Sequence, residues 1–188
     1  MPTAFFVTHP EVFVDPAMAV PAWRLSDRGI ARMRAFAANP ALSGLRSIWA
    51  STEAKAIEAA GLLAAGFGLP VQVDARLGEN DRSATGFLPP AEFEQTADRF
   101  FAHPHESIRG WERAIDAQHR VTQAVLDILR SHGDGDIAFV AHGGVGTLLL
   151  CRLMDEPISR VEDQPHQGHY FAFDLANRQI IHGWKPVS

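Results

Sequence analysis

Short apolar segments alternate with longer amphipathic segments along the chain, a pattern typical of α/β proteins. Residues 3–8, 47–51 and 136–141 are short apolar runs of the kind that form buried strands. Residues 70–77 alternate between apolar and polar positions, which predicts another strand. Because helical patterns separate these segments, we expect an α/β fold, a three-layer α/β/α sandwich with a mostly parallel central sheet.

Helical periodicity and breaking residues predict the remaining elements. Ser26 is a typical N-cap, and the helix that it starts should end near Ala38, before Asn39 and Pro40. Further helices are predicted over residues 52–65, 91–102, 111–129 and 144–154. Two closing strands are predicted over residues 170–174 and 179–182, joined by a turn at Asn177.

The length of 188 residues predicts one domain over residues 1–188, with a core large enough to need neither disulfides nor metals. Cys151 is the one cysteine, so no internal disulfide can form, and its apolar neighbours indicate a buried side chain. The N-terminal residues lack the pattern of a signal peptide, so we expect a cytoplasmic protein.

Charge and hydropathy narrow the range of partners. With 17 basic and 22 acidic residues the net charge is −5, so we expect no nucleic-acid partner. No apolar run approaches the ~18–20 residues of a membrane helix, so we expect no membrane partner. The sequence does not fix an oligomeric state and leaves a homodimer open.

Two histidines follow predicted buried strands directly. His9 comes after the strand at residues 3–8, and His142 after the strand at residues 136–141. The carboxyl ends of parallel strands lie along one edge of a sheet, and ligands of α/β proteins bind outside that edge. The two imidazoles can therefore meet there, although each histidine taken alone is more often a structural or surface residue. We interpret residues 78–110 as an insertion over the same edge.

Two further charged residues belong to this edge of the predicted sheet. Lys55 lies in the first turn of a predicted helix, where the helix dipole disfavours a cation unless an anion binds nearby. Glu79 follows the strand predicted at residues 70–77 and is available for acid/base chemistry, or is a solvated loop carboxylate.

Five short motifs, in this order, resemble those of the histidine phosphatase superfamily, the phosphoglycerate mutase-like proteins. They are Thr-His-Pro at residues 8–10, Leu-Ser-Asp-Arg-Gly at 25–29, Ser-Thr-Glu-Ala-Lys-Ala at 51–56, Leu-Gly-Glu at 77–79 and His-Gly-Gly at 142–144. The similarity extends over roughly residues 4–174, and it implies the phosphoglycerate mutase-like fold.

The resemblance also implies a mechanism that needs no metal and no other cofactor. His9 would attack phosphorus and become a phosphohistidine. Glu79 would protonate the leaving oxygen and then activate water. His142 and Lys55 would hold the phosphoryl oxygens, and Gly143 falls at a substrate-binding position. The remaining histidine pairs, at residues 103/105 and 166/169, lack the partners of a zinc site, so no metal is expected.

The chain departs from the family pattern at the phosphate-binding positions. Thr8 stands where the family has an arginine, and Lys55 stands where it has a second one. Pro10 replaces a glycine and has no N–H to offer. Arg24, Arg82 or Arg109 could restore the missing cation; we favour Arg82, three residues from Glu79.

Three interpretations of the function remain, and the first two belong to different classes. The first is a metal-independent phosphomonoesterase acting through a phosphohistidine at His9 on a small phosphorylated substrate, with inorganic phosphate as product. The alternative is a catalytically weak or inactive relative that binds a phosphorylated or anionic ligand or a protein partner. Mutase activity is less expected, because no residues indicate a pocket for a two-phosphate intermediate. Unrelated chemistry on the same fold is the third interpretation.

Overall fold

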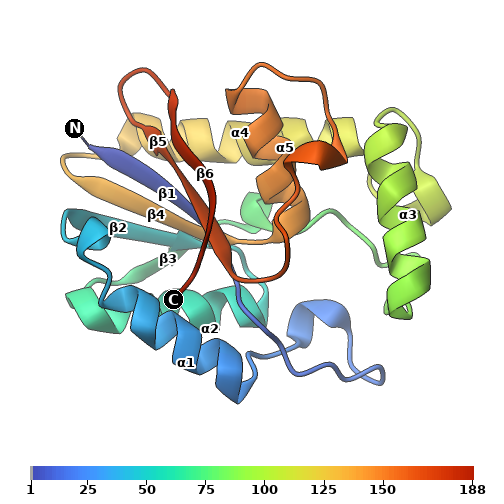
Figure 1. Cartoon of the computed structure of the whole chain (residues 1–188), viewed down its shortest axis with the longest axis horizontal. Coiled ribbons are helices and arrows are strands. Elements are labelled where there is room, and N and C mark those ends of the chain that lie inside the picture. Colours follow the sequence, from blue (N-terminus) through green and yellow to red (C-terminus); the bar gives the residue numbers. More distant parts are fainter. Residues whose placement is uncertain (1) are drawn as a thin grey trace.

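A six-stranded sheet runs through the middle of the structure, a computed structural model that describes residues 2–188. The strands lie in the order β3-β2-β4-β1-β5-β6 (Figure 1). β1 pairs in parallel with β4, and β2 with both β3 and β4. β5 is antiparallel to both of its neighbours, β1 and β6. The strand bounds are β1 Thr3–Thr8, β2 Leu45–Ala50, β3 Val71–Val73, β4 Asp136–Ala141, β5 His169–Asp174 and β6 Ile180–Pro186. The expected fold class, α/β with a mostly parallel sheet, is confirmed.

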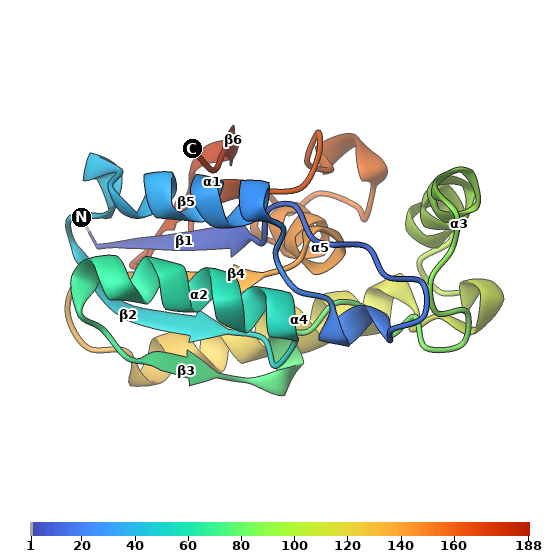
Figure 2. The same cartoon turned by 90° about the horizontal axis from the view of Figure 1, so that it is seen from below.

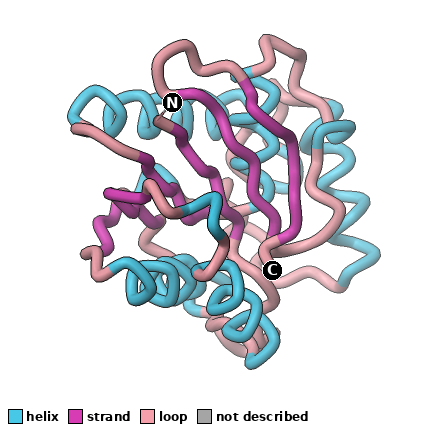
Figure 3. The backbone as a smooth tube through the Cα atoms, turned by 60° about the vertical axis from the view of Figure 1, so that its left-hand side comes forward, coloured by secondary structure: helices cyan, strands magenta, loops and turns pink. Residues whose placement is uncertain are grey.

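Helices cover both faces of this sheet, as the side view in Figure 2 and the tube in Figure 3 show. Alternating side chains of β1 divide the core, since Ala4 and Phe6 pack with α4 and α5, while Phe5 and Val7 pack with α1 and α2. The bounds are α1 Asp27–Ala37, α2 Ala54–Phe67, α3 Pro90–Ala102, α4 Ala114–Ser131 and α5 Gly143–Leu153.

Three predicted elements differ from the structure by three or more residues at one end. One is the last strand, predicted to end at residue 182, which extends to Pro186 as β6. The strand predicted at residues 70–77 is limited to β3, because the Asp74 carboxylate accepts the Arg76 N–H at 2.8 Å and turns the chain into a short 3₁₀ helix over Ala75–Leu77. The helix predicted from residue 111 begins at Ala114, as α4. Trp111 lies before this helix, and its side chain is buried.

The segment of residues 78–110 lies beyond the carboxyl ends of the parallel strands, where α3 stands apart from the sheet (Figures 1 and 2). An aromatic cluster connects it to the body of the molecule, with the Phe100 and Trp111 rings 6.1 Å apart between centroids. The Phe87 ring also lies 5.8 Å from the ring of Trp23, in the β1–α1 loop. Two loops therefore meet over this edge of the sheet.

The start of α1 holds the β1–α1 loop in place. The Ser26 hydroxyl accepts the Gly29 N–H at 3.2 Å, as an N-cap does, and donates to the Glu11 carbonyl at 3.1 Å. A Cβ on Gly29 would lie 2.3 Å from that carbonyl oxygen. The loop that follows His9 therefore packs directly on the backbone of α1.

We expect Gly29→Ala to lower the free energy of unfolding by about 2 kcal/mol, because the added methyl meets rigid backbone. Gly61→Ala is the matched control, since its Cβ would contact nothing within 4 Å in the middle of α2. This control should gain up to about 1 kcal/mol from helix propensity. Urea denaturation measures both, and equal stability of the two variants would contradict the close packing.

Candidate active site

His9 and His142 lie side by side at the carboxyl ends of β1 and β4. The parallel pairing aligns Thr8 with Ala141, and the His9 N–H donates to the Ala141 carbonyl at 3.1 Å. The centroids of the two imidazole rings are 5.2 Å apart, with an edge-on arrangement at 66°. The structure thus brings together the two histidines that the sequence placed at this edge.

Local hydrogen bonding fixes the tautomer of His9. Its Nδ1 lies 2.9 Å from the Pro10 carbonyl oxygen, which can only accept, so Nδ1 carries the proton. Nε2 therefore holds the lone pair. Burial, followed by the charges of His142 and Lys55, lowers the pKa of His9 to about 3. The ring is neutral at physiological pH, as a nucleophilic imidazole must be.

His142 is 1% exposed, and among the described residues its ring is contacted by polar groups at only one of its two nitrogens, Nε2. Its Nε2 lies 2.7 Å from the Ser51 hydroxyl and 3.3 Å from a carboxylate oxygen of Glu53. Burial lowers its pKa, although the charges of Glu53 and Glu79 oppose that shift. The other ring nitrogen, Nδ1, is buried and has no hydrogen-bond partner among residues 2–188. A buried polar atom without a partner indicates a place for a ligand atom or a water.

The Glu79 carboxylate rests on the N-terminus of α5. It accepts the Gly144 and Val145 N–H groups at 3.0 Å each, which satisfies two free donors of the helix. Burial alone would raise the pKa of Glu79, but the charges of Arg82 and His142 and the Gly144 N–H hold it below its usual range. Glu79 is therefore ionised in the protein without substrate.

Lys55 is 4% exposed and is already paired. Its ammonium lies 2.5 Å from the Glu53 carboxylate and donates to the Val20 carbonyl at 2.9 Å. Glu53 also accepts the Glu79 N–H at 3.0 Å through its other oxygen. Burial raises the pKa of Glu53, but His142, Lys55 and the Glu79 N–H together bring it down to about 2. A second carboxylate therefore sits between the predicted site residues.

Arg82 is held between two aromatic rings. Its guanidinium carbon lies 4.9 Å from the ring centroids of both Phe93 and Trp111. The Nε donates to the Asn80 side chain at 2.8 Å, and Nη2 lies 3.2 Å from the Glu79 carboxylate. Of the arginines considered from the sequence, this is the one that the structure places against Glu79.

The other two candidate arginines, Arg24 and Arg109, pair with carboxylates away from the two imidazoles. Arg24 pairs with Glu58 of α2, and its side chain is 73% exposed. Arg109 pairs with Glu92 in α3 at 3.2 Å. The structure does not place either guanidinium against the paired imidazoles.

Thr8 is fully buried, and its hydroxyl is hydrogen-bonded to other residues of the protein. It donates to the Gln164 side-chain oxygen at 2.6 Å and accepts the His169 N–H at 3.0 Å. The amide of Gln164 lies so close to Gly143 that a Cβ there would be 2.3 Å from its nitrogen. Gln164 thus bridges the Thr8 and Gly143 motifs.

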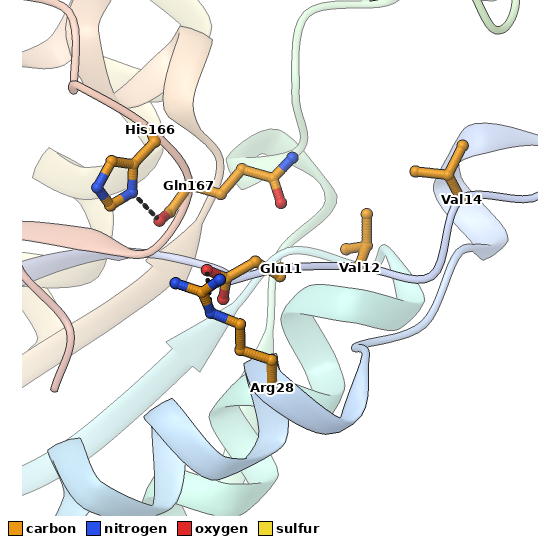
Figure 4. A pocket seen from close by; sticks show the side chains of 6 residues that line it. All are labelled: Glu11, Val12, Val14, Arg28, His166 and Gln167. Atoms are coloured by element: carbon orange, nitrogen blue, oxygen red, sulfur yellow. Dashed lines mark hydrogen bonds and ion pairs between the residues drawn. The ribbon is translucent and has the colours of Figure 1, made fainter.

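A cleft of about 440 Å³ opens beside the loop that follows His9 (Figure 4). Val12 and Val14 form an apolar side, and Glu11, Arg28, His166 and Gln167 complete the lining. Glu11 pairs with Arg28 at 3.3 Å and with Arg32 at 2.9 Å. None of the three predicted catalytic residues lines this cleft, so it adjoins the site rather than containing it.

Two further properties of the described residues concern other classes of function. Across residues 2–188, no three His, Cys, Asp or Glu side chains are grouped so that they could hold a metal ion. Within the same residues, no helix has the length and apolarity to cross a membrane.

Comparison with known proteins defines the family. A sequence model of the histidine phosphatase superfamily (branch 1) matches residues 20–174, so the chain belongs to this superfamily. No curated protein sequence matches the chain.

Solved structures with the same fold are similar over nearly the whole chain. Bacillus stearothermophilus YhfR has a TM-score of 0.83 and 23% identity, with coverage of 100% of this chain and 98% of its own. A mycobacterial glucosyl-3-phosphoglycerate phosphatase in complex with inorganic phosphate has a TM-score of 0.77 and 20% identity, with coverage of 98% and 95%. A phosphoserine phosphatase variant from Entamoeba histolytica in complex with phosphoserine has a TM-score of 0.79 and 13% identity, with coverage of 98% of this chain and 96% of its own. At these identities the likeness shows the fold alone.

The sequence analysis missed Glu53, Ser51 and Gln164. An acidic residue at the start of a helix, such as Glu53, is ordinarily explained by the helix dipole. The only sequence signal for an ion pair with Lys55 is that the two residues lie two positions apart. Gln164 lies in a loop far from Thr8 in sequence, and no pattern connects the two.

The depressed pKa of His9 predicts a loss of stability in acid. Between pH 6.5 and about 3 the unfolded chain binds a proton at this position and the folded chain does not, so the free energy of unfolding falls as the pH is lowered. When the pH is lowered from about 7 to about 4, we expect the free energy of unfolding to fall by on the order of 3 kcal/mol more in the wild type than in His9→Gln. Urea denaturation at both pH values tests this, and identical losses would contradict a neutral buried His9.

Arg82 should hold Glu79 in its ionised form. We expect Arg82→Gln to raise the pKa of Glu79, because the burial of this carboxylate is then no longer offset by the adjacent guanidinium. Carboxyl NMR titration measures the shift. Arg130→Gln is the control, since Arg130 pairs with Asp127 on α4 and should leave Glu79 unchanged. An unchanged pKa in Arg82→Gln would remove Arg82 from this role.

Proposed function

We propose that the chain is a phosphomonoesterase that works through a phosphohistidine at His9 and needs no metal ion. The observation that carries this proposal is the state of His9, a neutral imidazole with Nδ1 bound to the Pro10 carbonyl and a lone pair on Nε2. The ring lies beside His142, the second imidazole, at the carboxyl edge of the sheet. Membership of the histidine phosphatase superfamily supports the same chemistry.

The proposed reaction has two halves. Nε2 of His9 attacks phosphorus, the bond to the leaving oxygen breaks, and a phosphohistidine forms. Water then attacks phosphorus, the bond between phosphorus and His9 Nε2 breaks, and inorganic phosphate leaves, while the Glu79 carboxylate takes the proton of that water. Ionised Glu79 suits the second half, whereas the first half requires a proton for the leaving oxygen.

Several donors are available for the phosphoryl oxygens. The unpartnered Nδ1 of His142 is the first, in the neutral tautomer whose Nε2 accepts the Ser51 hydroxyl proton and whose Nδ1 carries the ring proton. The ammonium of Lys55 and the guanidinium of Arg82 supply positive charge close to Glu53 and Glu79. We propose that Arg82 takes the part of the arginine that Thr8 replaces, in agreement with its position against Glu79.

Specific contacts also favour the second candidate, a weak or inactive relative that binds a phosphorylated or anionic ligand or a protein partner. Lys55 is neutralised by Glu53, and the Thr8 hydroxyl is bound to Gln164. Loss of one donor to a reacting phosphoryl group costs roughly 10²–10³ in rate. The two candidates therefore differ in turnover, rather than in fold or in the position of the site.

The test is turnover of small phosphomonoesters in the presence of a chelator, with phosphoserine and a phosphoglycerate ester in the panel. We expect wild-type turnover that falls by roughly 10³ or more in His9→Ala, because the nucleophile is lost. His132→Ala is the control, since His132 bonds the Gly135 carbonyl at the end of α4. Acid-labile labelling of wild type, absent in His9→Ala, would identify the phosphohistidine. Wild-type turnover equal to that of His9→Ala would overturn the proposal in favour of the binding protein.

A further inference from the structure

The charged side chains around the two imidazoles cancel one another. Among the described residues, Lys55 and Arg82 contribute two positive charges, and Glu53 and Glu79 contribute two negative charges. Behind this group, Arg120 donates to the Glu79 carbonyl but is itself paired with Glu112 at 2.7 Å. Burial lowers the pKa of both His9 and His142. With both imidazoles neutral, the site has no net positive charge for a doubly charged phosphoryl group.

We propose that Glu53 restricts the site to phosphoryl groups that carry a single negative charge, so that a phosphomonoester binds as its monoanion. This inference rests on the proposed function, because it concerns the form of the substrate taken by the same site. Glu53 is thus a specificity-determining residue, and the excluded ligand is the phosphate dianion.

Three contacts keep Glu53 in place. One oxygen holds the Lys55 ammonium at 2.5 Å, and the other accepts the Glu79 N–H at 3.0 Å and lies 3.3 Å from His142 Nε2. The side chain is only 13% exposed. Turning it away would leave Lys55 buried without its partner, which is unfavourable. The carboxylate therefore stays beside Lys55 when a ligand arrives.

A dianion would add two uncompensated charges to this buried site, whereas a monoanion adds one. In an environment of low dielectric constant, that difference is larger than it would be in water. The ionised Glu79 increases it further, because a dianion would contact a second carboxylate. Two negative side chains in one phosphoryl site thus favour the protonated form of the ligand.

The monoanion also supplies the proton that the first half of the reaction lacks. The bond between His9 Nε2 and phosphorus forms as the bond to the leaving oxygen breaks. The proton on the phosphoryl oxygen passes through the Glu79 carboxylate to the leaving oxygen, which departs as an alcohol. A phosphohistidine with a doubly charged phosphoryl group remains, and Nδ1 keeps its proton on the Pro10 carbonyl. Atoms and charges balance without another reactant.

Binding of methyl phosphate and dimethyl phosphate to His9→Ala separates charge from shape. Methyl phosphate loses its second proton near pH 6, whereas dimethyl phosphate stays a monoanion. Between about pH 6.5 and about pH 8.5 we expect the affinity for methyl phosphate to fall roughly 100-fold, following the monoanion fraction. Dimethyl phosphate should change less than about threefold. NMR titration measures both affinities without turnover.

In Glu53→Gln combined with His9→Ala, the affinity for methyl phosphate should change less than about threefold over the same pH range. Lys55 has then lost its carboxylate partner and can pair with the second negative charge of the ligand. Glu94→Gln is the matched control, since Glu94 pairs with Arg160 on the surface and should keep the full dependence. The comparison of the two phosphates in His9→Ala tests the proposal even if Glu53→Gln does not fold.

Three outcomes would overturn the proposal: methyl phosphate affinity that is constant over this range, a parallel fall for dimethyl phosphate, or no binding of either compound. Turnover assays distinguish its failure from that of the proposed function. Wild-type kcat/KM that is independent of pH, with turnover dependent on His9, refutes the charge selectivity and keeps the phosphatase. The expected binding pattern without any turnover keeps the selectivity and refutes the phosphatase.

Discussion

The parallel pairing of β1 with β4 is the constraint on which the site depends. It places Thr8 opposite Ala141, so the next residue of each strand, His9 and His142, emerges at the same edge of the sheet. Apolar side chains on both faces of β1 hold this pairing in the core, with Phe6 against α5 and Phe5 against α1. The two imidazoles need no flexible loop to meet, and their separation of 5.2 Å follows from the spacing of adjacent strands.

Burial then determines how the charges around the imidazoles are arranged. A buried ion needs a partner, and here each cation has a carboxylate: Lys55 has Glu53, and Arg82 has Glu79. The same burial keeps His9 neutral, since its protonation would add an unpaired charge. The proposed nucleophilic role of His9 and the proposed selectivity against dianions both follow from this burial and this balance of charges.

The sequence predicts the parts of the structure that follow from local patterns. Apolar runs predict β1 and β4, and Ser26 predicts the start of α1, because strand burial and N-capping act over a few residues. The position of His9 and His142 at one edge follows from the parallel sheet. The shortening of β3 was not predicted, because the Asp74 side chain competes with strand pairing by bonding to Arg76. The Glu53–Lys55 pair and the Gln164 contact with Thr8 depend on tertiary packing, which no single-sequence pattern reports.

Residues of the Thr-His-Pro and Ser-Thr-Glu-Ala-Lys-Ala motifs are coupled to other residues of this structure. Thr8 is short enough to leave room for Gln164, whose amide fills the space against Gly143 and satisfies the threonine hydroxyl. An arginine at position 8 would have to displace Gln164, so replacing Thr8 alone would not supply a phosphate-binding guanidinium. Likewise, exchanging Lys55 for arginine would leave the Glu53 carboxylate in place and the added cation neutralised. The charge of this site is therefore determined by pairs of residues, and removal of Glu53 would leave the positive charge of Lys55 uncompensated.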